Sequence, residues 1–314
     1  MDMVSTSEDY SNRAKEHLAF SFLTEEVTSR YAIGALLGRG GFGAVFAGVR
    51  KADAREVSVK FFKNDPYFGM MTMPGETGVL PIEVGLMELV SKPFPSPYVL
   101  ELLEWFEIPN FIVLILERPS PCVDLADFCD FYNGKLPEAL ARDIMLQLVQ
   151  AAYHCSNCGV FHNDIKPGNV LINIETMQIK LFDFGSGKLL KDEPYNYSTS
   201  TPVYSPPEYF KHNQYRGCPA TIWSLGLVLY ILVFGDIPFK SWEEIIQGHL
   251  HFPSGISKDC CKLISWCLKQ NPKSRPSFRQ ILRHRWFSAG KSRVQKLPVI
   301  GSLVTRITQV FSNT

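Results

Sequence analysis

The alternation of apolar and polar positions divides the chain into segments of different character. Residues 1–30 are polar and mixed in charge, which predicts a flexible lead-in with at most one short helix. From Tyr31 the apolar positions alternate, in YAIGALLGRGGFGAVFAGVR and then in EVSVKFF. Two further apolar stretches, residues 98–106 and 111–116, flank a Pro-Asn turn. Alternation of this kind is typical of strands, so this part of the chain is expected to be built of strands.

Beyond residue 122 the apolar positions recur at helical spacing. The turn-rich stretch Glu117-Arg118-Pro119-Ser120-Pro121 predicts a stiff linker before this change. The helix over 221–234 is apolar nearly all round and is therefore expected to be buried. Its longest apolar run, 225–234, is far shorter than the roughly 20 residues that span a membrane. The other helices are predicted over residues 82–90, 124–130, 138–155, 242–247, 258–268 and 278–284. The fold class is therefore α+β.

Composition restricts the partners and the compartment. The chain has 314 residues, enough for two lobes with proper cores, and its formal net charge is +1. That balance argues against nucleic acid or an anionic membrane as a partner, and nothing demands more than a monomer. The N-terminus contains acids and no apolar core, so no secretory signal is expected. The eight cysteines are expected to be reduced structural thiols in a cytosolic or nuclear protein.

Three glycines and a valine follow the spacing GxGxxGxV, at Gly38, Gly40, Gly43 and Val45. Glycine lets backbone amides approach phosphate oxygens closely and tolerates positive φ. The spacing alone also occurs in dinucleotide-binding turns and in plain hairpins. The dinucleotide interpretation is disfavoured because the glycines lie between two strand patterns and no acid follows at the expected distance. Phe42 at the tip would suit a flap that closes over a nucleotide.

Lys60 ends the apolar strand VSVK, where a buried lysine is costly unless it is paired. Two acids on the next helical pattern are candidate partners, Glu83 and Glu88. Met87 lies four residues after Glu83 and so shares its face, whereas Glu88 points elsewhere. The spacing therefore favours a Lys60–Glu83 pair, and the alternative for Lys60 is an exposed position on an edge strand.

Residues 160–185, VFHNDIKPGNVLINIETMQIKLFDFG, bring four chemically active side chains into one short stretch: Asp164, Lys166, Asn169 and Asp183. Apolar runs separate the polar clusters, so a strand, a turn and a second strand would bring the two acids and the amide together. Phosphoryl transfer needs an acid for the attacking hydroxyl and oxygen ligands for Mg²⁺. The alternative is a surface hairpin with solvated charges.

These motifs together resemble the eukaryotic protein kinase family over residues 31–287. The resemblance rests on GRGGFGAV, VSVK with Glu83, HNDIKPGN, DFG, PPE and NPKSRP, in that order. Within the family the chain is most similar to the Pim serine/threonine kinases, in LILERPSPCVDL, DFGSGKLLKD and GDIPF. The resemblance implies a two-lobed fold, with an antiparallel-sheet N-lobe and a mostly helical C-lobe. Its segments would be a lead-in (1–30), the N-lobe (31–116), a linker (117–122), the C-lobe (123–287) and a basic tail (288–314).

The resemblance also implies an ATP- and Mg²⁺-dependent enzyme with assigned roles. Lys60 would hold the α and β phosphates and Glu83 would orient it. Asp164 would accept or orient the proton of the substrate hydroxyl, Lys166 would steady the transferred phosphoryl group, and Asn169 and Asp183 would bind Mg²⁺. Pro119 has no N–H for adenine, so the Glu117 carbonyl is expected to serve instead, with Leu116 as gatekeeper. The full nucleotide set would be Leu37, Gly38, Gly40, Gly43, Val45, Lys60, Leu116, Glu117 and Leu171.

The expected partners are proteins phosphorylated on Ser or Thr. Thr201 and Lys166 together are typical of Ser/Thr kinases. Pim kinases favour arginines upstream of the acceptor, and Asp124, Asp127 and Asp236 match the acidic positions that would bind them. The alternative for these acids is helix capping and solvated surface. Gly168 and Lys240 fall where the subfamily tends to be acidic, so the basic preference is expected to be weakened.

Several residues depart from the family pattern. Asn163 replaces the arginine of His-Arg-Asp, which normally binds a phosphate on the activation loop, so activity without such a phosphate is predicted. Ile222 and Ser58 replace a usual acid and a usual alanine, and Arg275 is expected to pair with Glu208.

The alternative function is a pseudokinase, a nucleotide-binding or scaffolding module without turnover. It is disfavoured because all five key residues are present: Lys60, Glu83, Asp164, Asn169 and Asp183. A small-molecule kinase is disfavoured by the PPE segment and Thr201.

Overall fold

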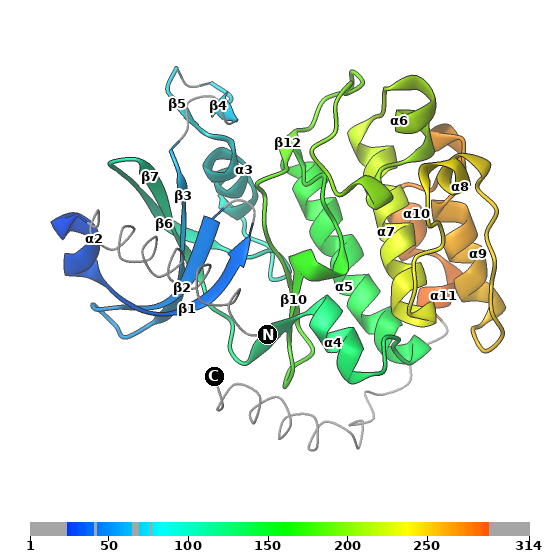
Figure 1. Cartoon of the computed structure of the whole chain (residues 1–314), viewed down its shortest axis with the longest axis horizontal. Coiled ribbons are helices and arrows are strands. Elements are labelled where there is room, and N and C mark those ends of the chain that lie inside the picture. The colour runs from blue at the N-terminus through cyan, green and yellow to red at the C-terminus, as the bar shows by residue number, and fades with distance from the viewer. Residues whose placement is uncertain (1–23, 41–42, 65–68, 76, 289–314) are drawn as a thin grey trace, which may run out of the picture. The chain divides into compact units, whose positions relative to one another are not determined.

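The computed structural model describes residues 24–40, 43–64, 69–75 and 77–288 (Figure 1). The chain divides into two compact units. The first holds the residues up to Gly85 together with Glu101–Arg118, and the second holds Leu86–Leu100 together with the chain from Pro119 onward. Residues 86–100, expected in the N-lobe from the sequence, therefore group with the second unit. The predicted tail from 289, most of the lead-in and Phe42 lie outside the described residues.

The first unit is built on a five-stranded antiparallel sheet (Figure 1). Its order is β1 (Tyr31–Gly40), β2 (Gly43–Arg50), β3 (Glu56–Lys63), β7 (Phe111–Glu117) and β6 (Leu102–Ile108). One face carries a core that includes Phe46, Val59 and Phe106, as the alternating pattern predicts. The short helix α2 (Glu25–Arg30) adds the fully buried Val27 to that core.

The strand predicted from residue 98 begins only at Leu102. The backbone of Tyr98 and Leu100 instead bonds to Leu181, at 2.8 and 2.9 Å, and Val99 forms an isolated bridge with the same residue. The apolar pattern of residues 98–100 is therefore satisfied by packing in the second unit. Periodicity alone does not reveal which partner a short apolar stretch will choose.

A second hairpin precedes the main helix of the sheet unit. Strands β4 (Met70–Thr72) and β5 (Val79–Pro81) pair antiparallel, and α3 (Ile82–Ser91) follows at once. A Cβ at Gly85 would lie 2.4 Å from the Met71 sulfur, so the hairpin packs directly on the first turns of α3. The Gly, Met and Pro content of residues 64–79 predicts a loop, so the pairing of β4 with β5 is a correction to that prediction.

The second unit is mostly helical. Its long helices α5 (Glu138–Asn157) and α7 (Gly217–Phe234) pack against each other, and α9 (Lys258–Cys267) packs on α7. The last described helix, α11 (Arg285–Ser288), buries Trp286 completely. The Trp286 indole donates a hydrogen bond to Glu138 at the start of α5, at 2.7 Å. The shorter helices are α4 (Leu125–Phe131), α6 (Pro207–His212), α8 (Trp242–Gln247) and α10 (Phe278–Leu282).

Among the described residues, α7 is the one helix that is long and apolar enough to pass a test for a membrane span. It is longer than the ten-residue apolar run considered from the sequence, because its first turns are apolar or small as well. Of this 18-residue helix, 78% is buried inside the protein. Core helices of globular proteins have the same composition, so α7 matches the buried helix that the sequence predicts.

Short strands in the second unit support its loops. Strand β10 (Val170–Asn173) lies between β11 (Ile179–Leu181) and β8 (Cys122–Asp124). A second pair joins β9 (Val160–Phe161) to β12 (Lys188–Leu189). The described part of the chain therefore consists of an antiparallel-sheet unit and a mostly helical unit, and the predicted α+β class is confirmed.

Candidate active site

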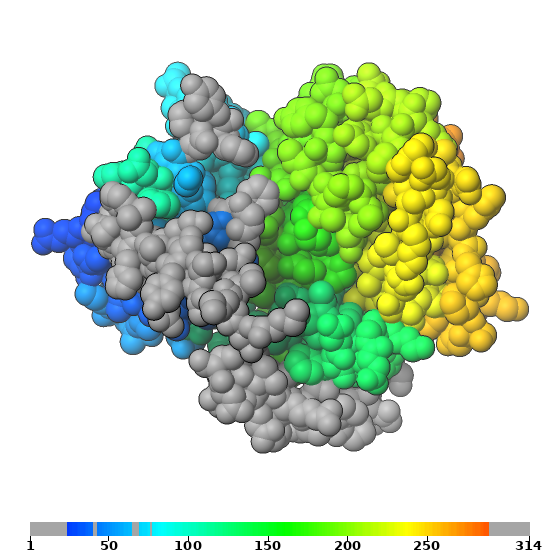
Figure 2. Space-filling view, in the orientation of Figure 1, coloured from blue at the N-terminus to red at the C-terminus, as the bar shows by residue number. Residues whose placement is uncertain are grey.

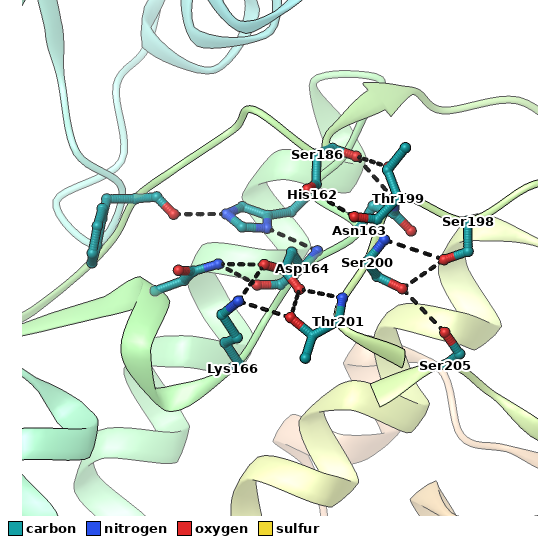
Figure 3. Close-up of polar contacts among 12 residues, drawn as sticks. His162, Asn163, Asp164, Lys166, Ser186, Ser198, Thr199, Ser200, Thr201 and Ser205 are labelled. Atoms are coloured by element: carbon teal, nitrogen blue, oxygen red, sulfur yellow. Dashed lines mark hydrogen bonds and ion pairs between the residues drawn. The ribbon is translucent and has the colours of Figure 1, made fainter. Parts of the chain in front are cut away.

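The loop between β9 and the 3₁₀ turn η1 (Pro167–Asn169) carries the first polar cluster. His162 is 2% exposed, and burial lowers the pKa of its imidazole below the ordinary 6.5. Its Nδ1 accepts the Asp164 backbone N–H at 3.3 Å, so Nε2 carries the proton and donates to the Phe182 carbonyl at 3.0 Å. A neutral histidine thus fixes the backbone direction of Asp164 (Figure 3).

The Asp164 carboxylate is the centre of this cluster (Figure 3). Its Oδ1 accepts the Thr201 N–H at 3.0 Å and the Thr201 hydroxyl at 2.9 Å. Its Oδ2 lies 2.8 Å from Lys166 Nζ and 2.9 Å from Asn169 Nδ2. Burial alone would raise the Asp164 pKa, but the hydrogen bonds from Lys166 and Thr201 outweigh it and the pKa is lowered. The group is an ionised acceptor at neutral pH, as a proton-accepting role requires.

The backbone just before the second acid is bonded to that of Asn169. Phe182 donates its backbone N–H to the Asn169 carbonyl at 3.0 Å, and Asp183 follows at once. Both Asn163 and Asp183 have positive φ, +67° and +64°, which is uncommon outside glycine and concentrates at functional sites. The predicted strand, turn and strand therefore bring the two acids and the amide into one region.

The donor set suits Mg²⁺. Asn169 Nδ2 donates to the Asp164 backbone carbonyl and carboxylate, at 2.8 and 2.9 Å, so Asn169 Oδ1 and the Asp183 carboxylate are the oxygens that would hold a metal. Mg²⁺ prefers such hard oxygens and is usually held by one or two carboxylates together with substrate phosphates. The described residues contain no cluster of three or more His, Cys, Asp or Glu that could hold a metal ion by itself.

In the sheet unit, Lys60 of β3 and Glu83 of α3 form a buried ion pair. Lys60 Nζ lies 2.6 Å from Glu83 Oε1, and the residues are 8% and 5% exposed. The rival acid Glu88 instead pairs with the exposed Lys92. The choice of Glu83 from helical spacing is thereby confirmed as a contact.

The glycine-rich strands form the hairpin that the alternation predicts, with Gly40 opposite Gly43. Gly43 has φ +144°, and a Cβ there would meet the Phe61 carbonyl oxygen at 1.9 Å, so only glycine fits. Gly38 has nothing within 4 Å of such a Cβ. The hairpin therefore has open space for a side chain at Gly38 and none at Gly43, where it lies directly against β3.

The other residues of the predicted nucleotide set lie on strands of both units. Leu37 is 48% exposed on β1, Val45 is half-buried on β2 and Leu116 is 6% exposed on β7. Leu171 lies on β10, where it is half-buried and pairs with Asp124 of β8. The Glu117 carboxylate accepts the Glu101 N–H at 2.8 Å. Contact of these residues with a nucleotide stays a prediction.

The acids expected to bind basic substrates have local partners. Asp124 caps α4, accepting the N–H groups of Ala126 and Asp127 at 2.9 Å, which is the alternative role considered from the sequence. Burial and the Asp124 charge raise the pKa of Asp127. Asp236 is exposed and pairs with Lys240, the residue that departs from the acidic pattern. Within the described part of the chain, Asp236 is the one of these three acids whose carboxylate forms an ion pair with a lysine.

The stretch from Asp183 to Glu208, called the activation segment below, is joined to residues 162–169, called the catalytic loop below, by charged groups at Thr201 and by neutral groups at Asn163 (Figure 3). Asn163 Nδ2 donates to the Ser186 carbonyl at 2.9 Å and to the Thr199 hydroxyl at 3.0 Å. Ser186 Oγ donates to the Thr199 carbonyl at 3.1 Å. A chain of hydroxyls, Ser198 to Ser200 to Ser205, continues along the segment. In the space-filling view the yellow-green surface of the helical unit corresponds to the chain near residue 200 (Figure 2).

At the activation segment lies a cluster that the sequence did not predict. It consists of Lys188 and three tyrosines, Tyr195, Tyr197 and Tyr215. Lys188 is 6% exposed on β12 and lies 3.8 Å from the centre of the Tyr197 ring. The only signal in the sequence is a lysine directly after DFGSG with two tyrosines close behind. Nothing in their spacing predicts that Tyr215 would join them.

The end of the segment is anchored by an ion pair that the sequence analysis did predict. Arg275 and Glu208 are each 8% exposed, and both guanidinium nitrogens reach the carboxylate, at 2.8 and 2.5 Å. The guanidinium also lies 5.0 Å from the Trp223 ring. The predicted Arg275–Glu208 contact is confirmed.

Comparison with known proteins identifies the family. A model of the protein kinase domain matches residues 31–287. Serine/threonine-protein kinase pim-2 of Danio rerio is 42% identical over 267 residues, covering 83% of this chain and 86% of the relative. Serine/threonine-protein kinase prk-2 of Caenorhabditis elegans is 36% identical over 260 residues, covering 82% of this chain and 58% of the relative. The PAS domain-containing serine/threonine-protein kinase of Mus musculus is 33% identical, covering 80% of this chain and only 18% of the relative.

The chain therefore belongs to the eukaryotic protein kinase family, whose members transfer phosphoryl groups from ATP with the help of Mg²⁺. Its similarity to pim-2 over most of both chains confirms the resemblance to the Pim serine/threonine kinases. The predicted class of enzyme, an ATP-dependent serine/threonine protein kinase, is thereby confirmed.

Proposed function

We propose that this kinase phosphorylates Ser or Thr in proteins with basic residues upstream of the acceptor, and that it does so without phosphorylation of its own activation segment. The observation that carries the proposal is the Asp164 site: an ionised carboxylate held by Thr201, Lys166 and Asn169. Each group has the charge and the hydrogen-bonding capacity that phosphoryl transfer requires.

In the proposed reaction the acceptor hydroxyl forms a bond to the γ-phosphorus of ATP as the bond from that phosphorus to the bridging oxygen breaks. The hydroxyl proton passes to Asp164, and ADP leaves with the bridging oxygen. Lys166, which already lies 2.8 Å from both Asp164 Oδ2 and the Thr201 hydroxyl, places its charge where the transferred group carries negative charge. Bound Mg²⁺, held by Asn169 and Asp183, would supply neutralisation of the phosphate charge.

In the sheet unit, Lys60 is proposed to hold the phosphates of ATP, with Glu83 fixing its ammonium group. Support comes from the burial of both side chains and from the 2.6 Å contact between the Lys60 ammonium group and the Glu83 carboxylate. Leu37, Val45, Leu116 and Leu171 are proposed to contact the base. The Glu117 carbonyl is the proposed partner of its amino group, since Pro119 has no N–H.

The activity of the unphosphorylated enzyme is supported by Asn163. An arginine at this position would need a phosphate to neutralise it, whereas the Asn163 amide is already satisfied by Ser186 and Thr199. The free thiols of all eight cysteines, which all lie among the described residues, agree with the proposed cytosolic or nuclear location. A monomer without nucleic-acid or membrane partners is likewise kept as a proposal.

The class is tested by phosphate transfer from ATP onto an Arg-rich serine peptide, comparing the protein with Asp183→Asn. The variant is expected to lose activity by at least 100-fold, because the metal loses a charged ligand. Equal signal from the two proteins would mean a contaminating kinase and would favour a scaffolding role without turnover.

The basic preference is tested separately with a peptide library. Lys240 neutralises Asp236, so Lys240→Glu is expected to raise the preference for an upstream arginine several-fold, about 1 kcal/mol. Lys262→Glu, at another exposed lysine of the helical unit, is the matched control. A library with no arginine enrichment in either protein would refute the preference while leaving the kinase activity intact.

A further inference from the structure

Lys188 is a buried cation that the catalytic roles above do not use. It lies on β12, where its backbone pairs with Phe161 of β9, two residues before Asn163. Only 6% of the residue is exposed, yet among the described residues no carboxylate lies within ion-pair distance of its ammonium group. A buried charge without a counter-charge lowers the stability of the fold, so stability does not explain why a lysine occupies this position.

Three tyrosine rings surround the Lys188 ammonium group: Tyr195, Tyr197 and Tyr215, called the tyrosine cage here. Nζ lies 5.3, 3.8 and 5.8 Å from their ring centres. The faces of aromatic rings carry partial negative charge and attract a cation within about 6 Å. Tyr195 and Tyr215 are themselves buried and joined by two backbone hydrogen bonds, at 2.8 and 3.0 Å. Two walls of the tyrosine cage are therefore fixed, while Tyr197 is 59% exposed.

The ammonium group also binds the segment backbone. Lys188 Nζ donates to the Tyr197 carbonyl at 2.7 Å and to the Tyr215 hydroxyl at 3.2 Å. That hydroxyl lies 3.0 Å from the same Tyr197 carbonyl and 3.4 Å from Asn163 Oδ1. The contacts of Lys188 therefore join those of Asn163, and together they hold residues 197 and 199, just before Thr201.

We infer that Lys188 and the tyrosine cage hold the activation segment with an internal cation, so that Thr201 is positioned at Asp164 without an added phosphate. The ring faces and the Tyr197 carbonyl supply the negative potential that a phosphate would otherwise supply to a cation. Lys188 is a positioning residue in this scheme, since it acts through Tyr197 and the segment. The predicted effect on rate rests on the proposed kinase activity, whereas the effect on segment order does not.

The cost of burial separates this role from a purely structural one. Burial and the nearby Lys191 lower the pKa of Lys188 to about 8, so the folded protein disfavours the charged form. An uncharged side chain of similar length should therefore leave the overall fold as stable as before or stabilise it. Residues at functional sites often lower the stability of the fold while the activity depends on them.

The test compares Lys188→Met, which keeps the length and removes the charge, with Lys188→Arg, which keeps a cation. Lys191→Met is the matched control, because Lys191 is exposed and also lies over the Tyr195 ring, at 5.1 Å. Hydrogen exchange of residues 189–201 and the thermal midpoint are measured beside kcat and the KM for ATP. Lys188→Met is expected to raise exchange in the segment roughly tenfold and to lower kcat to a similar extent. The KM for ATP and the thermal midpoint should not worsen.

Lys188→Arg should keep most of the protection, and Lys191→Met should match the parent protein. Unchanged exchange in Lys188→Met would overturn the inference, as would an equal loss in Lys188→Arg, since the cation would then be irrelevant. A fall of the thermal midpoint with faster exchange throughout the helical unit would mean a structural role only and would also overturn it. If the parent protein transfers no phosphate, the proposed function fails, and the exchange measurements still decide the role of the tyrosine cage.

Discussion

The side-chain amide of Asn163 donates a hydrogen bond to the Thr199 hydroxyl at 3.0 Å, although 36 residues separate them in the chain. The same amide donates to the Ser186 carbonyl at 2.9 Å. The catalytic loop and the activation segment are thus joined by neutral groups at the position where the family usually has an arginine. Because no charge awaits neutralisation at Asn163, this contact forms without modification of the protein.

Thr199→Val removes the hydroxyl while keeping the shape of the side chain. The hydroxyl accepts from Asn163 and donates to the Ser186 carbonyl, and the loss of these two hydrogen bonds, about 1–2 kcal/mol together, should lower kcat roughly five- to thirtyfold, because the segment before Thr201 is then held less firmly. Ser198→Asp should change kcat by no more than about twofold, since Asn163 cannot form the charge-assisted pair that an arginine forms. Steady-state kinetics measure both effects. A many-fold activation by Ser198→Asp would contradict the interpretation of Asn163.

Glu83→Gln tests the buried ion pair of the sheet unit. The change keeps the size of the side chain but leaves Lys60 without its carboxylate, so kcat/KM for ATP should fall by about 10- to 100-fold, the worth of one hydrogen bond between charged groups. Glu88→Gln is the matched control on the same helix, because Glu88 pairs only with an exposed lysine. If the two variants behaved alike, the pair would have no part in nucleotide use.

Arg275→Met tests the anchor at the end of the activation segment. Breaking a buried ion pair leaves Glu208 charged and uncompensated, which should lower the free energy of unfolding by about 3–5 kcal/mol. Urea unfolding measures the loss. The double variant Arg275→Met with Glu208→Met should recover a large part of it, since neither charge is then left alone. A double variant as unstable as the single one would show that packing of the guanidinium on Trp223 matters more than charge.

His162 makes the stability of the helical unit depend on pH. Its pKa is lowered by burial below 6.5, so the unfolded chain takes up this proton first as the pH falls. The free energy of unfolding should therefore fall below pH 6.5, by at most about 1.4 kcal/mol per pH unit from this group. His162→Asn keeps an acceptor for the Asp164 N–H and does not titrate. Urea unfolding at pH 7.5 and 5.5 should show a smaller loss in His162→Asn, and equal losses would count against this assignment.

Local patterns sufficed for much of the fold and of the site. Alternation predicted the glycine-rich hairpin, and helical spacing favoured Glu83 over Glu88 as the partner of Lys60. Both predictions depend only on patterns among residues that are close in the sequence. The order of the motifs then placed Asp164, Asn169 and Asp183 in one region. The contact between Asp164 and Asn169 forms within one short stretch of chain, which is why the sequence can predict it.

Contacts between distant parts of the chain were harder to predict. Residues 98–100 joined Leu181 instead of the sheet, and Lys188 found a tyrosine 27 positions later. Asp236 and Lys240 are only four positions apart, but the sequence alone did not predict that these two exposed side chains would form an ion pair. Each outcome depends on which surfaces meet in the folded protein, and neither propensity nor periodicity contains that information.

The hydrogen bond from Trp286 to Glu138 spans 148 positions of the chain and joins the last described helix to the start of α5. During synthesis, Glu138 must wait for Trp286, roughly 7 to 30 s at ordinary elongation rates of about 5–20 residues per second. Throughout that time the start of α5 lacks the aromatic side chain that later covers it. During this interval α5 has been synthesised, but Trp286 does not yet cover its first turn. Chaperones can bind the exposed start of the helix in that time.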